Sequence, residues 1–290
     1  MSNKSMSNKP LEGKVALVTG AASPIGIGRH VTMAMIEAGA RVALLDRNGE
    51  WLEKTVAEAR ALGGQDCALP ILADITDPEA AAQAVNTAAT HFGGLHVLFN
   101  NAGTSPTAEG LMPDVRGRET RFWEITPEAW SRVVAVNFSG AFFMSRAAAP
   151  LLLAQGWGRI ISVTTSMDTM YRKGNAPYGP SKAGHEALLA TMAQELEGSG
   201  VTANVLTPGG GTNTNLIPRS VPDTYRNALI KPEVMRAPAV WLASNASDGF
   251  NGQRIIAARW DETLPITERL ARAAAPAAWP QRGAQSVRPS

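Results

Sequence analysis

Short apolar, β-branched runs alternate with longer stretches of helical periodicity along most of the chain. Runs such as 15–19 and 41–45 predict buried strands, because a strand covered on both faces carries consecutive apolar residues. After the first run, Val31, Met35 and Ile36 recur at helical spacing and Gly39 ends the pattern. This alternation predicts an α/β fold, with helices covering a doubly wound parallel sheet.

The same pattern gives approximate bounds for the remaining elements. We expect strands at 15–19, 41–46, 68–72, 95–99, 159–163, 202–206 and 253–257, and helices at 51–62, 78–91, 127–153, 178–196, 232–242 and 264–274. Right-handed crossovers would then gather the residues that follow the strands at one carboxyl edge of the sheet.

A glycine-rich turn lies between the first strand and the first helix. Gly20, Gly26 and Gly28 let an anion approach the backbone, and the helix N-terminus supplies N–H groups and a favourable dipole. Asp46 ends the second strand, near the position of a ribose-binding carboxylate in dinucleotide folds. A plain strand–turn–helix corner has the same outline, but the acid at the strand end favours a dinucleotide site.

Tyr178 and Lys182 stand four residues apart on a predicted helix, so both side chains share one face. A nearby ammonium favours the phenolate, which predicts a tyrosine pKa lowered toward neutrality and an acid–base role. A surface Tyr-x-x-x-Lys pair is common on amphipathic helices, so the pair indicates a catalytic site only in combination with the other motifs of the chain.

Taken with these neighbours, the chain resembles the short-chain dehydrogenase/reductase family over roughly residues 11–258. The resemblance is carried by six motifs in order: Thr19-Gly20 to Gly28, Asp74-Ile75, Asn100-Asn101-Ala102-Gly103, Asn137, Tyr178 with Lys182, and Pro208-Gly209. It implies a single Rossmann-type domain with about seven strands at 11–262, followed by an extension at 263–290. The first residues are polar and nearly repeat themselves, so we expect a disordered tail at 1–10.

The resemblance also implies an oxidoreductase that transfers hydride between NAD(H) and a secondary alcohol or ketone. Its implied catalytic residues are Asn137, Thr165, Tyr178 and Lys182. Its implied cofactor-binding residues are Gly20, Ser23, Ile25, Gly26, Ile27, Gly28, Asp46, Arg47, Asp74, Ile75, Asn101, Ala102, Gly103, Tyr178, Lys182, Pro208, Gly209 and Thr212. Arg47 could attract the 2′-phosphate of NADP, so an NADP-dependent reductase stays open. So does a dinucleotide-binding regulator without catalysis.

Two features depart from the family pattern. Five residues instead of three separate Gly20 from Gly26, and Pro24 removes one N–H donor from this longer loop. The position thirteen residues before Tyr178 holds Thr165 where the family has serine, with Ser166 beside it. A threonine hydroxyl can donate and accept as serine does, and the spacing selects Thr165. A bulge or turn at the end of the strand would bring Ser166 to Tyr178 instead, so both hydroxyls stay open.

Composition narrows the partners. The net charge is only +2 and no basic stripe with interleaved aromatics is visible, which argues against nucleic acid. Cys67 is the only cysteine, which fits a reducing compartment, and we expect a cytoplasmic protein. The apolar stretch at 141–154 is interrupted by Arg146 and Pro150, so no membrane span is expected. The four histidines have no ligand cluster around them, so we expect no metal site.

Two long connections and the assembly state complete the expectations. The segment 104–124, with Asp114, Arg116, Arg118, Glu119 and Arg121, is either a solvated loop, a rim over the substrate mouth or a subunit contact. The segment 209–231 occupies the place of the family's mobile substrate loop. The family also implies a homotetramer, with a dimer as the alternative, since small residues at Ala183, Ala187 and Ala190 permit close helix packing.

Overall fold

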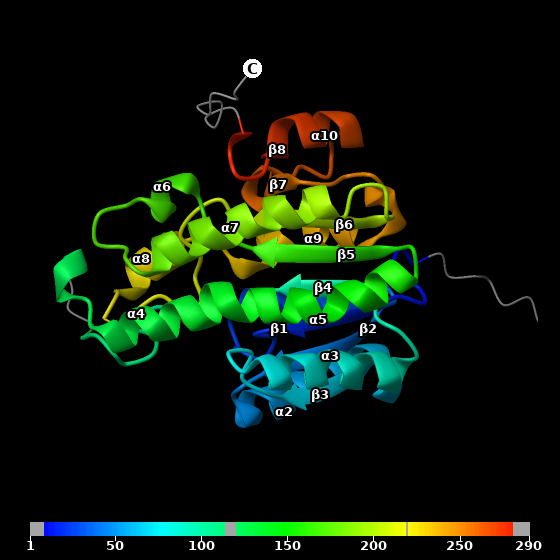
Figure 1. The fold of residues 1–290 in the computed structure, drawn as a ribbon, viewed down its shortest axis with the longest axis horizontal. Coiled ribbons are helices and arrows are strands. Elements are labelled where there is room, and N and C mark those ends of the chain that lie inside the picture. Colours follow the sequence, from blue (N-terminus) through cyan, green and yellow to red (C-terminus); the bar gives the residue numbers. More distant parts are fainter. Residues whose placement is uncertain (1–8, 114–119, 219, 281–290) are drawn as a thin grey trace, which may run out of the picture.

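A computed structural model describes residues 9–113, 120–218 and 220–280. One eight-stranded sheet with the order β3-β2-β1-β4-β5-β6-β7-β8 runs through the molecule (Figure 1). Every pairing is parallel except the antiparallel pair of β7 and β8. The strands are β1 Val15–Thr19, β2 Arg41–Asp46, β3 Ala68–Leu72, β4 Val97–Asn100, β5 Gly158–Val163, β6 Val201–Thr207, β7 Gln253–Ile256 and β8 Ala274–Pro276. The doubly wound α/β architecture predicted from the sequence is confirmed.

Helices cover both faces of this sheet. They are α1 Ile27–Glu37, α2 Gly49–Gly63, α3 Pro78–Phe92, α4 Pro127–Val134, α5 Ala141–Ala154, α6 Met167–Met170, α7 Tyr178–Glu195, α8 Asp223–Ala228, α9 Arg236–Ala243 and α10 Ile266–Ala273. Val31 of α1 and Leu242 of α9 belong to one buried cluster, and Val85, Met144 and Leu189 of α3, α5 and α7 belong to the other. Figure 1 views the molecule with α3, α5 and α7 in front of the sheet.

The boundaries follow local chemistry where the sequence carries a clear signal. Asp77 caps α3 by accepting a hydrogen bond from the backbone N–H of Glu79, and Pro78 occupies the first turn. Asn48 caps α2 in the same way through the N–H of Trp51. These caps explain why the predicted starts of both helices lie within two residues of the observed ones.

The predicted single helix at 127–153 is divided by a π-helical segment. α4 ends at Val134, the π-helix spans Ala135–Gly140, and α5 continues from Ala141. Ile75 packs so closely on Gly140 that a Cβ there would lie 2.7 Å from Cδ1 of Ile75. The segment contains Asn137, which fits the frequent occurrence of π-turns at functional sites.

The helix expected at 264–274 is present as α10, and a strand that was not predicted follows it. After α10, β8 pairs with β7 and gives the sheet eight strands instead of about seven. Trp241, Phe250 and Trp260 form an aromatic cluster beneath this region, and the guanidinium of Arg269 lies over Trp260. The short helices α6 and α8 were also not predicted, because neither has enough residues to show a helical period.

Several sequence predictions lie outside the described residues. These are most of the expected N-terminal tail at 1–8, the charged residues Asp114, Arg116, Arg118 and Glu119, and residues 281–290. Within 9–113, 120–218 and 220–280, none of the helices combines the length and apolar character that a bilayer crossing requires.

Candidate active site

The segments that follow β1, β4 and β5 meet at the carboxyl edge of the sheet. The side-chain amide of Asn101, after β4, donates to the carbonyl oxygens of Thr19 and Gly20 at 2.9 and 3.0 Å. A Cβ on Gly103 would lie 3.3 Å from Nζ of Lys182 and 3.5 Å from Oδ1 of Asn137. The turn after β4 therefore contacts the glycine loop, Asn137 and Lys182.

The glycine loop is shaped by close backbone approach. Gly20 has a φ of +62°, and a Cβ there would lie 2.8 Å from Cα of Ala102, so only glycine fits. The two added residues form an outward turn, closed by the N–H of Gly26 donating to the carbonyl of Ser23 at 2.8 Å. Because the turn absorbs them, α1 still begins directly after Gly26.

The N-terminus of α1 fits an anionic group. Within α1, all of which the structure describes, no side chain caps the N-terminus and the first turn carries no acidic residue. Its first N–H groups therefore remain available to phosphate oxygens. These features, with the cradle at Gly20, fit the pyrophosphate of a dinucleotide.

Asp46 stands beside this loop at the end of β2. Its carboxylate accepts hydrogen bonds at 3.0 Å from the backbone N–H groups of Ala22 and Asn48. The acid is thereby held against the glycine loop.

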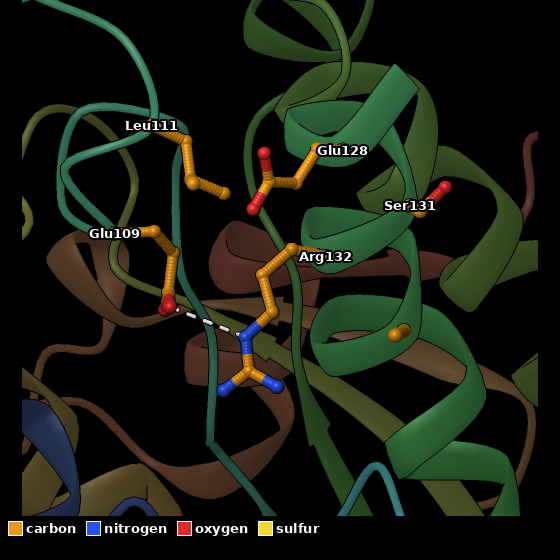
Figure 2. A pocket seen from close by; sticks show the side chains of 6 residues that line it. Glu109, Leu111, Glu128, Ser131 and Arg132 are labelled. Atoms are coloured by element: carbon orange, nitrogen blue, oxygen red, sulfur yellow. Dashed lines mark hydrogen bonds and ion pairs between the residues drawn. The ribbon is translucent and has the colours of Figure 1, made fainter. Parts of the chain in front are cut away.

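Asp74, a predicted site residue, belongs to an ion-pair network with Arg132 and Glu109, which the sequence did not single out. Arg132 of α4 contacts Asp74 through both terminal nitrogens at 3.1 Å, and its Nε donates to Glu109 at 3.1 Å (Figure 2). Glu109, Leu111, Glu128, Ser131 and Arg132 line a cavity of about 480 Å³ there, together with Ala135. The first half of the 104–124 connection thus makes specific contacts and is more than a solvated loop.

Lys182 lies inside the site with its ammonium on the end of β5. Nζ donates to the carbonyl oxygen of Val163 at 2.8 Å, and burial lowers the pKa of Lys182 to about 8. Burial raises the pKa of Tyr178 to about 12. The lowered tyrosine pKa predicted from the four-residue spacing is therefore wrong, because desolvation of the phenol is the dominant effect.

Three consecutive hydroxyls follow β5, and their partners differ. Thr164 donates to the carboxylate of Glu186 at 2.7 Å, while the hydroxyl oxygen of Ser166 lies 2.8 Å from that of Thr169. Among the described residues, the hydroxyl groups of Thr165 and Tyr178 have no hydrogen-bond partner. Thr165 is thus the hydroxyl in this trio left available to a substrate oxygen.

Asn137 is fully buried and its carboxamide is fully engaged. Oδ1 accepts from the N–H of Thr104 at 2.7 Å, and Nδ2 donates to the carbonyl of Thr104 and the hydroxyl of Ser181 at 3.0 and 3.1 Å. The side chain therefore links the turn after β4 to the first turn of α7.

A buried ion pair between Glu186 and Arg254 contacts the segment that holds Thr164 and Thr165. Glu186 is fully buried on α7, and its Oε1 lies 3.1 Å from Nε of Arg254 on β7. Arg254 also donates to the carbonyl oxygen of Thr165 at 2.7 Å. The N–H of Ala278, after β8, donates to Glu186 at 3.3 Å. Sequence reasoning missed this pair, although Glu186 follows Lys182 by four residues and so shares its helix face.

The remaining predicted residues belong to the connections that border the site. The amide of Asn215 donates to the hydroxyl of Ser23 at 3.0 Å, so the 209–231 segment contacts the glycine loop. Thr212 forms an isolated bridge with Ile230. The carbonyl of Pro208 accepts from the N–H of Ala258 at 3.0 Å. Ile25, predicted to contact cofactor, is 40% exposed on the added turn.

The described residues contain no group of three or more His, Cys, Asp or Glu side chains arranged to hold a metal ion. Among the histidines, His185 lies in the site, where burial lowers its pKa to about 3. It is therefore a neutral imidazole at physiological pH.

We expect Lys182→Met to stabilise the protein more at pH 7 than at pH 10. The folded-state pKa is lowered from 10.5 to about 8, so the folded protein carries a buried ammonium below pH 8. The free energy that this buried ammonium costs the folded state is fully present below pH 8. It disappears as the pH rises from about 8 to 10.5, because the unfolded state binds more protons than the folded state in that range. The stability difference from the unmodified protein should shrink by about 2–3 kcal/mol between the two pH values. Urea unfolding measures it, and a constant difference would contradict the lowered pKa.

Comparison with known proteins identifies relatives of the whole fold. A family model described as short chain dehydrogenase matches residues 14–223. The 2,5-dichloro-2,5-cyclohexadiene-1,4-diol dehydrogenase LinX of Sphingobium indicum is 36% identical over 262 residues, which cover 90% of this chain and 94% of that protein. A short-chain type dehydrogenase/reductase of Picea abies is 32% identical over 256 residues, with 84% and 90% covered. The crystal structure of a short-chain type dehydrogenase/reductase from Mycobacterium marinum superposes with a TM-score of 0.73 at 28% identity, covering 85% of this chain and 94% of that one.

Proposed function

This chain belongs to the short-chain dehydrogenase/reductase family, and from this membership and the site's geometry we propose that it interconverts a secondary alcohol and a ketone with NAD(H). One observation carries the proposal. Lys182 and Asn137 border the same backbone turn at Gly103, beside the glycine loop that Asn101 ties to β4. The ammonium of Lys182, the carboxamide of Asn137 and the glycine loop therefore meet at one edge of the sheet, which supports a nicotinamide and a proton-transfer group acting there.

In this proposal each residue has a distinct role. The nicotinamide supplies or accepts the hydride when it is bound. Tyr178 holds its proton at neutral pH because burial raises its pKa to about 12, which suits donation to a carbonyl oxygen. Thr165 donates a hydrogen bond to the same oxygen, Lys182 favours the phenolate that forms, and Asn137 fixes the turn that borders them.

Asp46 is the residue we propose to select NAD. Its carboxylate would accept hydrogen bonds from the adenosine ribose hydroxyls and would repel a 2′-phosphate. NADH should therefore bind more tightly than NADPH, and Asp46→Ala should narrow the ratio of the two dissociation constants by about tenfold, the scale of one charge-assisted hydrogen bond. Titration of nicotinamide fluorescence measures both constants. Tighter binding of NADPH by the unmodified protein would refute the assignment.

Two alternative functions can be distinguished from the proposed one by simple experiments. An NADP-dependent reductase would show the reversed cofactor preference in the same titration. A dinucleotide-binding regulator would bind NADH but form none of it from any alcohol. Steady NADH formation with a panel of secondary alcohols, including cyclic diols, would establish catalysis, and its absence at every pH between about 6 and 10 would sink the enzyme proposal.

We further propose that the chain assembles as a homotetramer, with a dimer as the alternative. Ala187 is exposed and Ala183 and Ala190 are half-buried on the outer side of α7. Trp130 of α4 and Phe142 of α5 are 47% and 39% exposed, so adjoining helices present apolar surface suited to packing against a second copy. Light scattering at micromolar concentration should give four times the monomer mass; a monomer mass would contradict both states.

A further inference from the structure

Glu109 is a nearly buried carboxylate that holds the residue directly after Asp46. Nη1 and Nη2 of Arg47 donate to Oε2 and Oε1 of Glu109 at 3.0 and 2.8 Å, which is a bidentate ion pair. The Glu109 side chain is only 8% exposed, whereas that of Arg47 is 51% exposed. The exposed guanidinium of Arg47 is therefore bound to a carboxylate that lies in the protein interior.

Contacts independent of Arg47 keep Glu109 in place. The hydroxyl of Thr104 donates to Oε1 at 2.6 Å, and Nε of Arg132 donates to Oε2 at 3.1 Å (Figure 2). Arg132 is anchored in turn on Asp74. Although burial opposes ionisation, the hydrogen bonds from Thr104 and Arg47 hold the pKa of Glu109 below its usual range. Glu109 is thus a fixed negative charge at physiological pH.

We propose that Glu109 is a specificity-determining residue that withholds Arg47 from the 2′-phosphate of NADP(H). Arg47 follows the carboxylate that faces the ribose, so its guanidinium is the cation best placed to bind a phosphate there. Its two terminal nitrogens already bind Glu109, and a phosphate would have to displace that carboxylate. Discrimination against NADP(H) is therefore shared between Asp46 and a residue from the connection after β4. This inference rests on the proposed dinucleotide site.

Dissociation constants for NADPH and NADH test the inference without any substrate. Glu109→Gln removes the charge but keeps an acceptor for Thr104, so Arg47 becomes free to bind phosphate. The dissociation constant for NADPH should fall about fivefold, the scale of a half-exposed ion pair of ~1 kcal/mol, while that for NADH changes less than about twofold. Glu128→Gln is the matched control: it removes a charge from the same cavity, but among the described residues Glu128 has no hydrogen bond to Arg47.

Replacing Arg47 separates release of the guanidinium from simple loss of a negative charge. Arg47→Met alone should leave NADPH binding within about twofold of the unmodified protein, whereas in the Glu109→Gln background it should abolish the gain. A gain that survives without Arg47, an equal gain in Glu128→Gln, or an unchanged NADPH-to-NADH ratio in Glu109→Gln would overturn the inference. Arg47→Met also tests it if Glu109→Gln fails to fold, since a loss of NADPH affinity above about fivefold would mean that Arg47 is already available. Failure to bind either nucleotide would instead refute the proposed function.

Discussion

Tyr178→Phe should lower turnover about 10²–10⁴-fold, the range for removing a general acid–base group. Phenylalanine keeps the ring but removes the hydroxyl, which has no competing partner among the described residues. Because burial keeps the phenol protonated at neutral pH, reduction of a ketone should suffer at least as strongly as oxidation of an alcohol. Initial rates in both directions measure the loss, and unchanged NADH binding would locate it in the chemical step.

The neighbouring hydroxyls provide the matched series. Thr165→Val should reduce turnover about a hundredfold, the scale for losing one donor to a developing oxyanion. Thr165→Ser should keep most activity, and Ser166→Ala should change it little, because the Ser166 hydroxyl is engaged with Thr169. The reverse ranking would assign the role to Ser166. Full activity of both Thr165→Val and Ser166→Ala, with Tyr178→Phe inactive, would leave the phenol as the sole proton-transfer group.

Arg254→Met should destabilise the folded protein by about 3–5 kcal/mol, because it leaves the carboxylate of Glu186 buried without its cation. The loss should appear as a lower urea midpoint with an unchanged slope. Activity should also fall, since Arg254 donates a hydrogen bond to the carbonyl oxygen of Thr165 and helps to position that residue.

The paired replacement Glu186→Met with Arg254→Met controls for lost packing. When both charges are removed, no unpaired charge is buried, so the double variant should be less destabilised than the sum of the single variants. Strict additivity of the two effects would contradict an energetic coupling between Glu186 and Arg254. A stability within about 0.5 kcal/mol of the unmodified protein for Arg254→Met would show that the pair contributes little.

The sequence predicted those parts of the fold whose signals are local. The strand at Ala68–Leu72 and the start of α7 at Tyr178 lie where the apolar pattern placed them. β8 was missed because Ala274–Pro276 is short and not strongly apolar, and it becomes a strand only by pairing with β7. The π-helix at Asn137 was missed because hydrophobic periodicity does not distinguish one extra residue in a turn.

The residues of the candidate site that carry local sequence motifs were predicted, and those that depend on long-range contacts were not. Motifs supplied the predicted residues, whereas Glu109, Arg132, Glu186 and Arg254 carry no motif and contact partners that lie far from them in the chain. The tyrosine pKa was predicted with the wrong sign because spacing shows the neighbouring cation but gives no measure of burial. Desolvation depends on every segment that covers the phenol, and the chain order does not reveal it.

Synthesis of the chain imposes an order on the completion of this site. Arg254 follows Glu186 by 68 residues, and Ala278 follows it by 92. At ~5–20 residues per second, the ribosome needs roughly 3–14 s after making Glu186 to supply its cation. Until then the carboxylate has to stay hydrated, because burying it unpaired is too costly. We therefore expect the helix that carries Tyr178 and Lys182 to pack fully against the sheet only after the last strands have emerged, so that this edge of the sheet is completed late in synthesis.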